Sequence, residues 1–318
     1  MSKTIRVYGA GGAGTNIATH FIGHQSKTLN AAIAPAVLDT SEANLRGRDI
    51  KDIDTHLIEG LDGSGKIRSE NYDQIRRCIK QMLVDIPPED FNVVVFSGSG
   101  GSGSVIGPLL IKELQERDIP VIGVVIGSYE SMISAVNTKK TLQSLESIAE
   151  KTDKPTVICY QGNEPNTPRS EVDAGIHTLI GAISILASGN VREMDTRDIY
   201  NWVYFNKISG RAQLAILRLA YDENTASNVK LPISVASLYN DPDQQHQLFD
   251  TDYHTVGYTD LRTAANVEEL HFFISTYDLA KIYSDIREVT DNLEQARQAR
   301  VERDSIVTDD RNDDGMVV

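Results

Sequence analysis

Eight consecutive glycine and serine residues, 97–104, interrupt the sequence at a place where few folds tolerate them. They directly follow an apolar run, Val93–Phe96, that is typical of a buried strand, and they precede a predicted helix. Glycine loses more conformational freedom on folding than any other residue, so this run indicates a backbone that approaches another group closely. A flexible linker has a similar composition, but a linker does not lie between a buried strand and a helix. Successive free N–H groups and serine hydroxyls in this position favour an anion, and we expect a phosphate there.

Two further glycine-rich loops follow short apolar runs. Gly9–Gly14 satisfies the pattern G-x-G-x-x-G, and Asp39 stands where a dinucleotide-binding fold has its ribose-binding acid. The third loop, Gly60–Lys66, follows a short apolar stretch at 57–58. Either loop could instead be a tight turn without a ligand. No complete G-x-x-x-x-G-K-[ST] motif occurs, which argues against a P-loop nucleotide hydrolase. Three glycine loops at the strand ends of one sheet can together surround one polyphosphate.

Short β-rich apolar runs alternate with helical stretches through the first half of the chain. This alternation predicts a mostly parallel sheet with helices on both faces, and a ligand site at the carboxyl ends of its strands. The predicted strands are Ile5–Tyr8, Ala36–Leu38, Val93–Phe96, Val121–Ile126 and Thr156–Tyr160, and the predicted helices include Tyr72–Leu83 and Thr141–Glu150.

The second half of the chain has a different organisation. A long helix is predicted for Glu171–Ser188, because apolar residues recur there at spacings of three and four. Residues 190–276 are expected to form a mixed α/β unit with strands near Ile233–Leu238 and His271–Ser275. A final helix, Leu279–Val301, is expected to pack either on this second unit or on a neighbouring subunit.

Composition limits the partners and the compartment. The formal charge is −14 without a block of Lys and Arg, which argues against direct binding of nucleic acid. No apolar run approaches the roughly 20 residues that span a bilayer, and no signal peptide is evident, so no membrane partner is expected. Cys78 and Cys159 provide neither a disulfide framework nor metal-ligand spacing. We therefore expect a cytoplasmic protein without metal-ligating side chains. From Asp304 onward, five aspartates accompany one arginine, which is typical of a disordered tail.

At the glycine loops the chain resembles the tubulin/FtsZ superfamily of polymerising GTPases. The segment Gly100–Val105 is similar to the family signature G-G-T-G-[ST]-G, with Ser102 in place of Thr and Val105 in place of the last Gly. Glu130 stands where bacterial members place a ribose-contacting Glu, although the family's usual Pro is missing beside it. The resemblance implies a nucleotide held by Gly11, Gly12, Ala13, Asn16, Asp39, Gly63, Ser64, Gly65, Gly100, Gly101, Ser102, Gly103, Ser104 and Glu130.

The resemblance continues beyond the phosphate loops. Asn163 and Asp173 stand where the family reads guanine, and a carboxylate can accept both the ring N–H and the exocyclic amine of that base. Taken alone, Asp173 could simply be an acid that complements a helix N-terminus. The family's catalytic loop, N-x-D-F-x-D, becomes Glu193–Asp198, with both acids kept as Asp195 and Asp198. Two carboxylates on one helical face can polarise a water, although a solvated capping cluster has the same pattern.

In this family the two acids act on the nucleotide of the next subunit, so the resemblance implies a GTPase whose active site is completed by assembly. The likeness covers essentially the whole chain and is nearest to phage-encoded members, on the fragments 100–105, 201–203 and 314–318. It implies a GTP-binding domain (1–170), a central connecting helix (171–190), a second domain (191–278), a C-terminal helix (279–303) and an acidic tail (304–318).

The implied cofactors are GTP or GDP with Mg²⁺, and the implied partner is the protein itself, in filaments that position phage DNA or replication structures in the host bacterial cytoplasm. We expect the acidic tail to contact a basic patch on a neighbouring subunit. Two alternatives remain open. One is an NAD(P)-dependent oxidoreductase built on Gly9–Gly14 and Asp39, which leaves residues 97–104 and the Asp pair unexplained. The other is a nucleotide-binding filament protein without hydrolysis.

Overall fold

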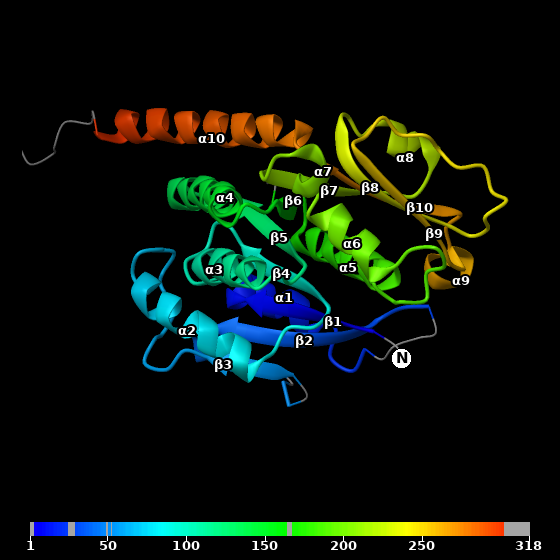
Figure 1. Cartoon of the computed structure of the whole chain (residues 1–318). Coiled ribbons are helices and arrows are strands. Elements are labelled where there is room, and N and C mark those ends of the chain that lie inside the picture. Colours follow the sequence, from blue (N-terminus) through cyan, green and yellow to red (C-terminus); the bar gives the residue numbers. More distant parts are fainter. Residues whose placement is uncertain (1–2, 25–28, 49, 52, 164–166, 302–318) are drawn as a thin grey trace, which may run out of the picture.

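The computed structural model describes residues 3–24, 29–48, 50–51, 53–163 and 167–301. In this part of the chain the strands form one ten-stranded sheet, in the order β3-β2-β1-β4-β5-β6-β7-β10-β8-β9. Figure 1 shows helices on both sides of the first six strands. The strands are β1 (Thr4–Ala10), β2 (Ala32–Asp39), β3 (Asp54–Leu57), β4 (Phe91–Ser97), β5 (Val121–Ser128), β6 (Thr156–Asn163), β7 (Leu214–Ala220), β8 (Pro232–Tyr239), β9 (Tyr253–Tyr258) and β10 (Glu269–Ser275).

The first six strands are parallel, and the buried side chains of β1, β2, β4, β5 and β6 alternate between two apolar cores. On β4, Val93 and Val95 belong to a core shared with α1 and α5, whereas Val94 and Phe96 belong to a core shared with α2, α3 and α4. Burial on both faces explains why β4 is an uninterrupted apolar run in the sequence. These helices are α1 (Gly11–Thr19), α2 (Tyr72–Asp85), α3 (Gly103–Glu116), α4 (Met132–Thr152) and α5 (Arg169–Leu186), and a 3₁₀ helix covers Glu42–Asn44.

The second unit is a mixed α/β structure beyond the long helix α5. Strand β10 lies between β7 and β8 and is antiparallel to both, while β8 and β9 are parallel. Trp202 on α6 is fully buried, and its indole Nε1 donates a 3.1 Å hydrogen bond to the carbonyl oxygen of Phe272 on β10. Helix α6 is thereby fixed on the second unit's sheet. The short helices here are α6 (Thr196–Val203), α7 (Asn206–Ser209), α8 (Glu223–Ser227) and α9 (Leu261–Ala265).

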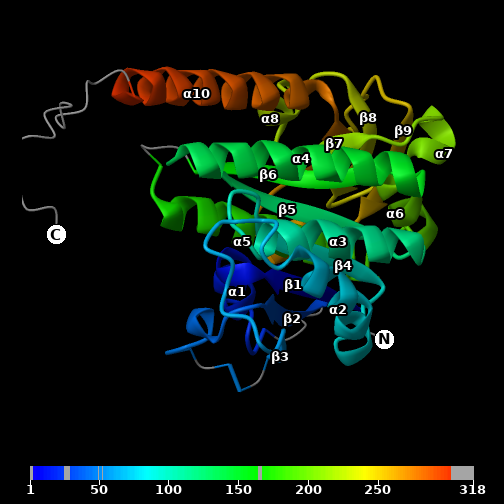
Figure 2. The same cartoon turned by 90° about the vertical axis from the view of Figure 1, so that its left-hand side faces the viewer.

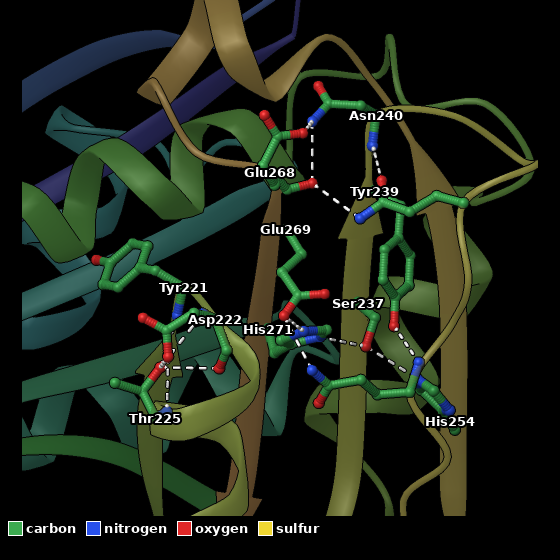
Figure 3. A network of polar contacts seen from close by, with 12 residues as sticks. Tyr221, Asp222, Thr225, Ser237, Tyr239, Asn240, His254, Glu268, Glu269 and His271 are labelled. Carbon is green, nitrogen blue, oxygen red and sulfur yellow. Dashed lines mark hydrogen bonds and ion pairs between the residues drawn. The ribbon is translucent and has the colours of Figure 1, made fainter.

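A chain of polar side chains crosses three strands of this second unit (Figure 3). Ser237 Oγ on β8 lies 2.8 Å from His254 Nε2 on β9 and 2.8 Å from His271 Nδ1 on β10. His271 is fully buried, and burial lowers its pKa to about 4. Its Nε2 lies 3.6 Å from Glu269 Oε1, a distance that makes an ion pair only if the imidazole is protonated and that is too long for a hydrogen bond. Burial is the main influence on the His271 pKa and lowers it well below 7, so the imidazole is neutral at pH 7.

Helix α10 (Tyr277–Val301) packs on β7 of the second unit, as one of the two predicted alternatives has it, and also on α4 of the first unit, which was not predicted. Ile286 is buried there, and Leu279, Ile282 and Tyr283 join the core beneath α2, α3 and α4. Among residues 291–299 only Leu293 is not exposed, and Figures 1 and 2 show this end of the helix projecting past α4. The acidic tail, 304–318, lies outside the described residues. No helix in the described part of the chain combines the length and the apolar composition needed to cross a membrane.

Some elements differ from the sequence-based prediction. Helix α4 begins at Met132 rather than Thr141, because its first turns carry Ser134, Asn137 and Thr138, which are buried but polar and so form no apolar stripe. Strands β3, β7 and β9 were not predicted. Helix α5 begins and ends two residues before the predicted bounds, a difference within the ordinary uncertainty of helix ends.

Candidate nucleotide-binding site

A cavity of about 750 Å³ lies at the carboxyl ends of the parallel strands. Ser104 does not line it. That side chain is buried, and its hydroxyl donates at 2.8 Å to the carbonyl oxygens of Gly100 and Gly101. Ser104 therefore stabilises the loop from the side that faces away from the cavity. The other residues predicted to hold the nucleotide all line this one cavity: Gly11, Gly12, Ala13, Asn16, Asp39, Gly63, Ser64, Gly65, Gly100, Gly101, Ser102, Gly103, Glu130, Asn163 and Asp173.

The three glycine loops meet at one end of the cavity, where Gly11 of the first and Gly103 of the second lie backbone to backbone. A Cβ atom added to Gly11 would lie 2.8 Å from Gly103 N, and one added to Gly101 would lie 1.8 Å from Ser64 Oγ. Gly11 also has a φ of +68°, which L side chains rarely adopt. A side chain at either glycine would therefore force the loops apart. The close approach leaves a concave surface of backbone and hydroxyl groups that suits an anion.

Polar side chains outside the glycine runs fasten the loops together. Asn137 on α4 donates through Nδ2 to Lys66 O at 2.7 Å and to Ser99 O at 3.3 Å, which joins the second and third loops. Thr40 Oγ1, after β2, lies 2.5 Å from Ser102 Oγ. Sequence reasoning missed Asn137, because an asparagine inside a helix belongs to no motif and only the folded chain shows which carbonyls it reaches.

Asp39 lies at the end of β2 and is almost fully buried. Burial raises the pKa of its carboxyl group, while hydrogen bonds from Asn44 and from the backbone N–H groups of Thr40 and Ser41 lower it. Asn44 Nδ2 donates to Asp39 Oδ2 at 2.8 Å, and Asn44 Oδ1 would lie 2.8 Å from a Cβ atom on Gly12. Asp39 therefore holds Asn44 against the first glycine loop, and it shapes the cavity through that contact.

Helices α1 and α5 form the opposite end of the cavity. Asn16 Nδ2 on α1 donates to Asp173 Oδ2 on α5 at 2.8 Å, and Arg48 donates to Asn16 Oδ1 at 3.2 Å. One helical turn below, the rings of His20 and His177 stack with their centroids 3.7 Å apart. The Asn16–Asp173 pair is thus held by two packed helices, with Asn163 at the end of β6 also lining this end. Such a carboxylate can accept the two adjacent donors that guanine presents and adenine does not.

The cavity is also lined by three cationic side chains that sequence reasoning did not assign to it: Arg48, Lys66 and Arg169. Arg169 donates to Glu130 Oε1 at 2.8 Å, and this hydrogen bond lowers the pKa of Glu130, which therefore stays ionised. Lys66 Nζ donates to the hydroxyl of Ser134 at 3.1 Å and has no carboxylate within 4.0 Å among the described residues. The signal for Lys66 was its place at the end of the third glycine loop, whereas Arg48 and Arg169 follow no recognisable pattern.

Asp195 and Asp198 do not line this cavity. They form a capping box at the start of α6, in which Asp195 Oδ1 accepts from Arg197 N at 2.7 Å and Asp198 Oδ2 accepts from Asp195 N at 2.9 Å. The backbone hydrogen bonds from Asp198 and Arg197 lower the pKa of the Asp195 carboxyl. The start of α6 lies beside the amino ends of the strands, next to Lys3 and Phe91. The two carboxylates therefore lie side by side and also cap a helix, and they do so at the opposite end of the sheet from the glycine loops.

Comparison with known proteins gives a consistent result for both halves of the chain. The GTPase domain of the Tubulin/FtsZ family matches residues 4–163, and the C-terminal domain of phage tubulin-like proteins matches residues 194–278. The phage tubulin-like protein of Pseudomonas phage phiKZ is 31% identical over 100% of this chain and 99% of its own length.

Two solved structures are similar throughout. The GDP complex of the phage tubulin PhuZ has a TM-score of 0.90 and 28% identity, and the alignment covers 100% of both chains. The protofilament of TubZ from bacteriophage PhiKZ has a TM-score of 0.88 and 32% identity over 98% of this chain and 96% of that one. The predicted tubulin-like α/β fold is confirmed, and the dinucleotide-dependent oxidoreductase is the poorer interpretation of Gly9–Gly14 and Asp39. This chain belongs to the Tubulin/FtsZ family, among the phage tubulin-like proteins.

Proposed function

We propose that this chain binds GTP in the cavity at the carboxyl ends of its parallel strands, hydrolyses it, and assembles with copies of itself into filaments. The observation that carries the proposal is one cavity with three glycine loops at one end and the Asn16–Asp173 pair at the other. Free backbone N–H groups suit a polyphosphate, and a carboxylate suits the donor edge of guanine. The two ends lie in one cavity of about 750 Å³, which suits a single nucleotide.

Mg²⁺ fits this cavity only in company with the nucleotide. No group of three potential metal-binding side chains occurs among the described residues, and the Asp39 carboxylate already accepts three hydrogen bonds. Mg²⁺ often keeps several waters and is bound largely through substrate phosphates, an arrangement that needs few protein ligands. The hydroxyls of Thr40 and Ser102 are two of the groups available near the glycine loops. When bound, Mg²⁺ would neutralise phosphate charge, while the backbone N–H groups of the loops orient the phosphates.

We propose that Asp195 and Asp198 act on the nucleotide of a neighbouring subunit. Asp173 and the end of α5 at Leu186 are separated by about 20 Å along the helix axis, and the Asp pair lies beyond that end. The two acids therefore cannot reach the cavity of their own subunit. A head-to-tail contact would bring the amino ends of one sheet to the carboxyl ends of the next. The similar TubZ from bacteriophage PhiKZ has been solved as a protofilament, which supports such a contact here.

Turnover measured against protein concentration tests this proposal. Phosphate release per molecule should rise steeply above a threshold concentration, because each active site needs a neighbour. Asp198→Ala should still bind GTP and sediment as polymer, with turnover lower by roughly 10²- to 10⁴-fold. A constant rate per molecule at all concentrations would contradict the shared active site. Polymer without any phosphate release from the wild type would favour the alternative of a filament protein that binds nucleotide without hydrolysis.

We propose that the acidic tail, 304–318, docks on a basic surface of the next subunit. Seven cationic side chains from α2, α3, α4 and the preceding loop line one cavity, together with only two glutamates. In a chain of net charge −14 this is an unusual concentration of positive charge. The basic surface consists of Arg68, Arg76, Arg77, Lys80, Lys112, Lys140 and Lys151.

Truncation and charge reversal test the tail contact together. A chain ending at Arg303 should bind GTP normally but need a higher protein concentration for assembly. Changing Arg76 and Arg77 to Glu should raise the threshold in the full-length chain and have no further effect in the truncated one. Equal thresholds for full-length and truncated protein in a sedimentation assay would show that the tail makes no such contact.

We further propose the cellular setting and the domain limits that the resemblance implied. Residues 1–170 form the GTP-binding domain, 171–190 the connecting helix, 191–278 the second domain and 279–303 the C-terminal helix. The relative from Pseudomonas phage phiKZ supports action in the cytoplasm of an infected bacterium, where filaments would position phage DNA or replication structures. Fluorescent labelling in infected cells, with wild-type protein and with Asp198→Ala, tests this role, since persistent filaments should misplace the phage DNA.

A further inference from the structure

We infer that Tyr253 is a positioning residue for Asp198, and that strand β9 holds the proposed catalytic loop, Val191–Asp198, in place. The inference rests on the proposed role of Asp198 in hydrolysis. Tyr253 is the first residue of β9, and its hydroxyl donates to Asp198 Oδ1 at 3.2 Å. The two residues are 55 positions apart in the sequence, so the contact exists only in the folded chain.

The two carboxylate oxygens of Asp198 have different partners. Oδ2 accepts from Asp195 N at 2.9 Å, which is the local capping contact at the start of α6. Oδ1 accepts from Tyr253, which comes from another element of the second unit. A single hydrogen bond leaves a carboxylate free to rotate about its side-chain torsions, whereas bonds to both oxygens fix its plane. Tyr253 therefore determines which lone pairs of the half-buried Asp198 remain available to a water.

Asp195 is a poorer candidate for this task. Its Oδ1 accepts from the backbone N–H groups of both Arg197 and Asp198, at 2.7 and 3.1 Å. Those bonds complete the capping box, and both fall on one oxygen, so they tie Asp195 to the start of its own helix and not to another element. The geometry thus distinguishes the two acids: both cap the helix start, and only Asp198 is also held by a side chain from β9.

Strand β9 also holds the other end of the loop that leads to the Asp pair. Arg192 and Tyr258 exchange two backbone hydrogen bonds, with N···O distances of 2.9 and 3.0 Å. At Gly257 the loop comes so close that an added Cβ atom would lie 2.3 Å from Val191 Cγ1. Contacts at both ends of one six-residue strand therefore set the path of the segment from Val191 to Asp198.

Tyr253 acts through orientation rather than proton transfer. Burial, followed by the adjacent Asp198 charge, raises the pKa of its hydroxyl, so this group stays protonated and donates. Removal of the hydroxyl should leave the capping contact intact and let the Asp198 carboxylate turn. Small misplacements of a positioned group slow catalysis substantially, and we expect turnover to fall about tenfold. The apparent affinity for GTP should not change, because Tyr253 is remote from the nucleotide cavity of its own subunit.

Tyr253→Phe tests this inference, with Tyr258→Phe as a matched control on the same strand. The hydroxyl of Tyr258 makes no hydrogen bond to Asp195 or Asp198 in the described part of the chain. Turnover, GTP KM and the threshold for assembly would be measured for both variants, for Asp198→Asn and for Tyr253→Phe combined with Asp198→Asn. Thermal midpoints of all variants establish that each is folded.

The expected result is a roughly tenfold loss of kcat in Tyr253→Phe, with unchanged KM and assembly threshold, and wild-type behaviour in Tyr258→Phe. Combined with Asp198→Asn, the tyrosine change should cause no further loss, because a positioning residue acts only through its partner. Wild-type kcat in Tyr253→Phe, beside a large loss in Asp198→Asn, would overturn the inference and leave the proposed function standing. A multiplied loss in the double variant would overturn it as well. Wild-type kcat in Asp198→Asn would overturn the catalytic assignment and the positioning role together.

Discussion

Mild acid should destabilise the second unit through His271. The unfolded chain binds a proton on this histidine with a pKa near 6.5, whereas burial lowers the value in the folded chain to about 4. Above pH 6.5 the histidine is neutral in both states, and its titration does not affect stability. Between pH 6.5 and 4 only the unfolded chain binds the proton, so the folded state is progressively destabilised as the pH falls. Each pH unit in this window costs about 1.4 kcal/mol, and the full effect is about 3 kcal/mol.

The groups around His271 support this direction. Ser237 provides the hydrogen bond to Nδ1, and it is shared with His254, whose pKa is also lowered, chiefly by burial and then by His246 (Figure 3). Glu269, 3.6 Å from Nε2, would favour the charged imidazole, but its own pKa is raised by burial and then by Asp222 and Glu223. Acidification therefore neutralises the Glu269 carboxylate over the same pH range in which the His271 imidazole is protonated.

Urea unfolding followed by Trp202 fluorescence measures this effect. Trp202 is the only tryptophan in the sequence, and its indole donates a hydrogen bond to the backbone of Phe272, the neighbour of His271 on β10. Between pH 7.5 and 5.5, in GDP and below the assembly threshold, the free energy of unfolding should fall by about 1.4 kcal/mol from His271 alone. His271→Asn should be less stable at pH 7.5, because it leaves a cavity, but should lose this part of the pH dependence. His24→Asn, a change at an exposed histidine, should keep the wild-type dependence. Equal pH dependence in wild type and His271→Asn would refute the assignment.

Three further predictions concern the cavity and the loop before α6. Asp173→Ala should cost on the order of 1–3 kcal/mol of GTP affinity, measured by calorimetric titration, and equal binding of GTP and ATP by the wild type would contradict guanine recognition. Lys66→Met removes a cation whose ammonium group donates only to the Ser134 hydroxyl among the described residues, and it should weaken GTP binding by about tenfold, whereas unchanged affinity would place Lys66 outside the phosphate contacts. Glu193 has a φ of +62°, which asparagine tolerates better, so Glu193→Asn should raise the free energy of unfolding by about 1 kcal/mol, and a lower midpoint in urea would argue against backbone strain there.

The departure of Glu193 from the family's Asn illustrates what a motif contains. In the sequence this position looks like a lost polar contact. In the structure it is a backbone position in the left-handed region, where asparagine is favoured for its conformation. Only the φ angle distinguishes these two explanations, and no property of the sequence around residue 193 specifies it.

Contacts between distant segments account for most of what sequence reasoning missed. Asn137, Tyr253 and Ser237 each act on partners in other elements, and none lies in a recognisable pattern. Helix α10 has an apolar stripe that indicates a packed face, but the stripe is equally compatible with the second unit, a neighbour or α4. The contact with α4 depends on which apolar surface the folded first unit presents to α10, and the stripe does not encode that surface.

The sequence by itself determined the parallel sheet, the three glycine loops at its strand ends and the acid at the start of the long helix. These features follow from local physics, because apolar runs, glycine and helix-terminal residues restrict the backbone where they occur. The tertiary structure alone decided that the loops meet in one cavity, that Ser104 faces away from it, and that Asp195 and Asp198 lie at the far end of the sheet. Those outcomes depend on strand order and on close approach between segments that are distant in the sequence, and they arise only when the whole chain packs.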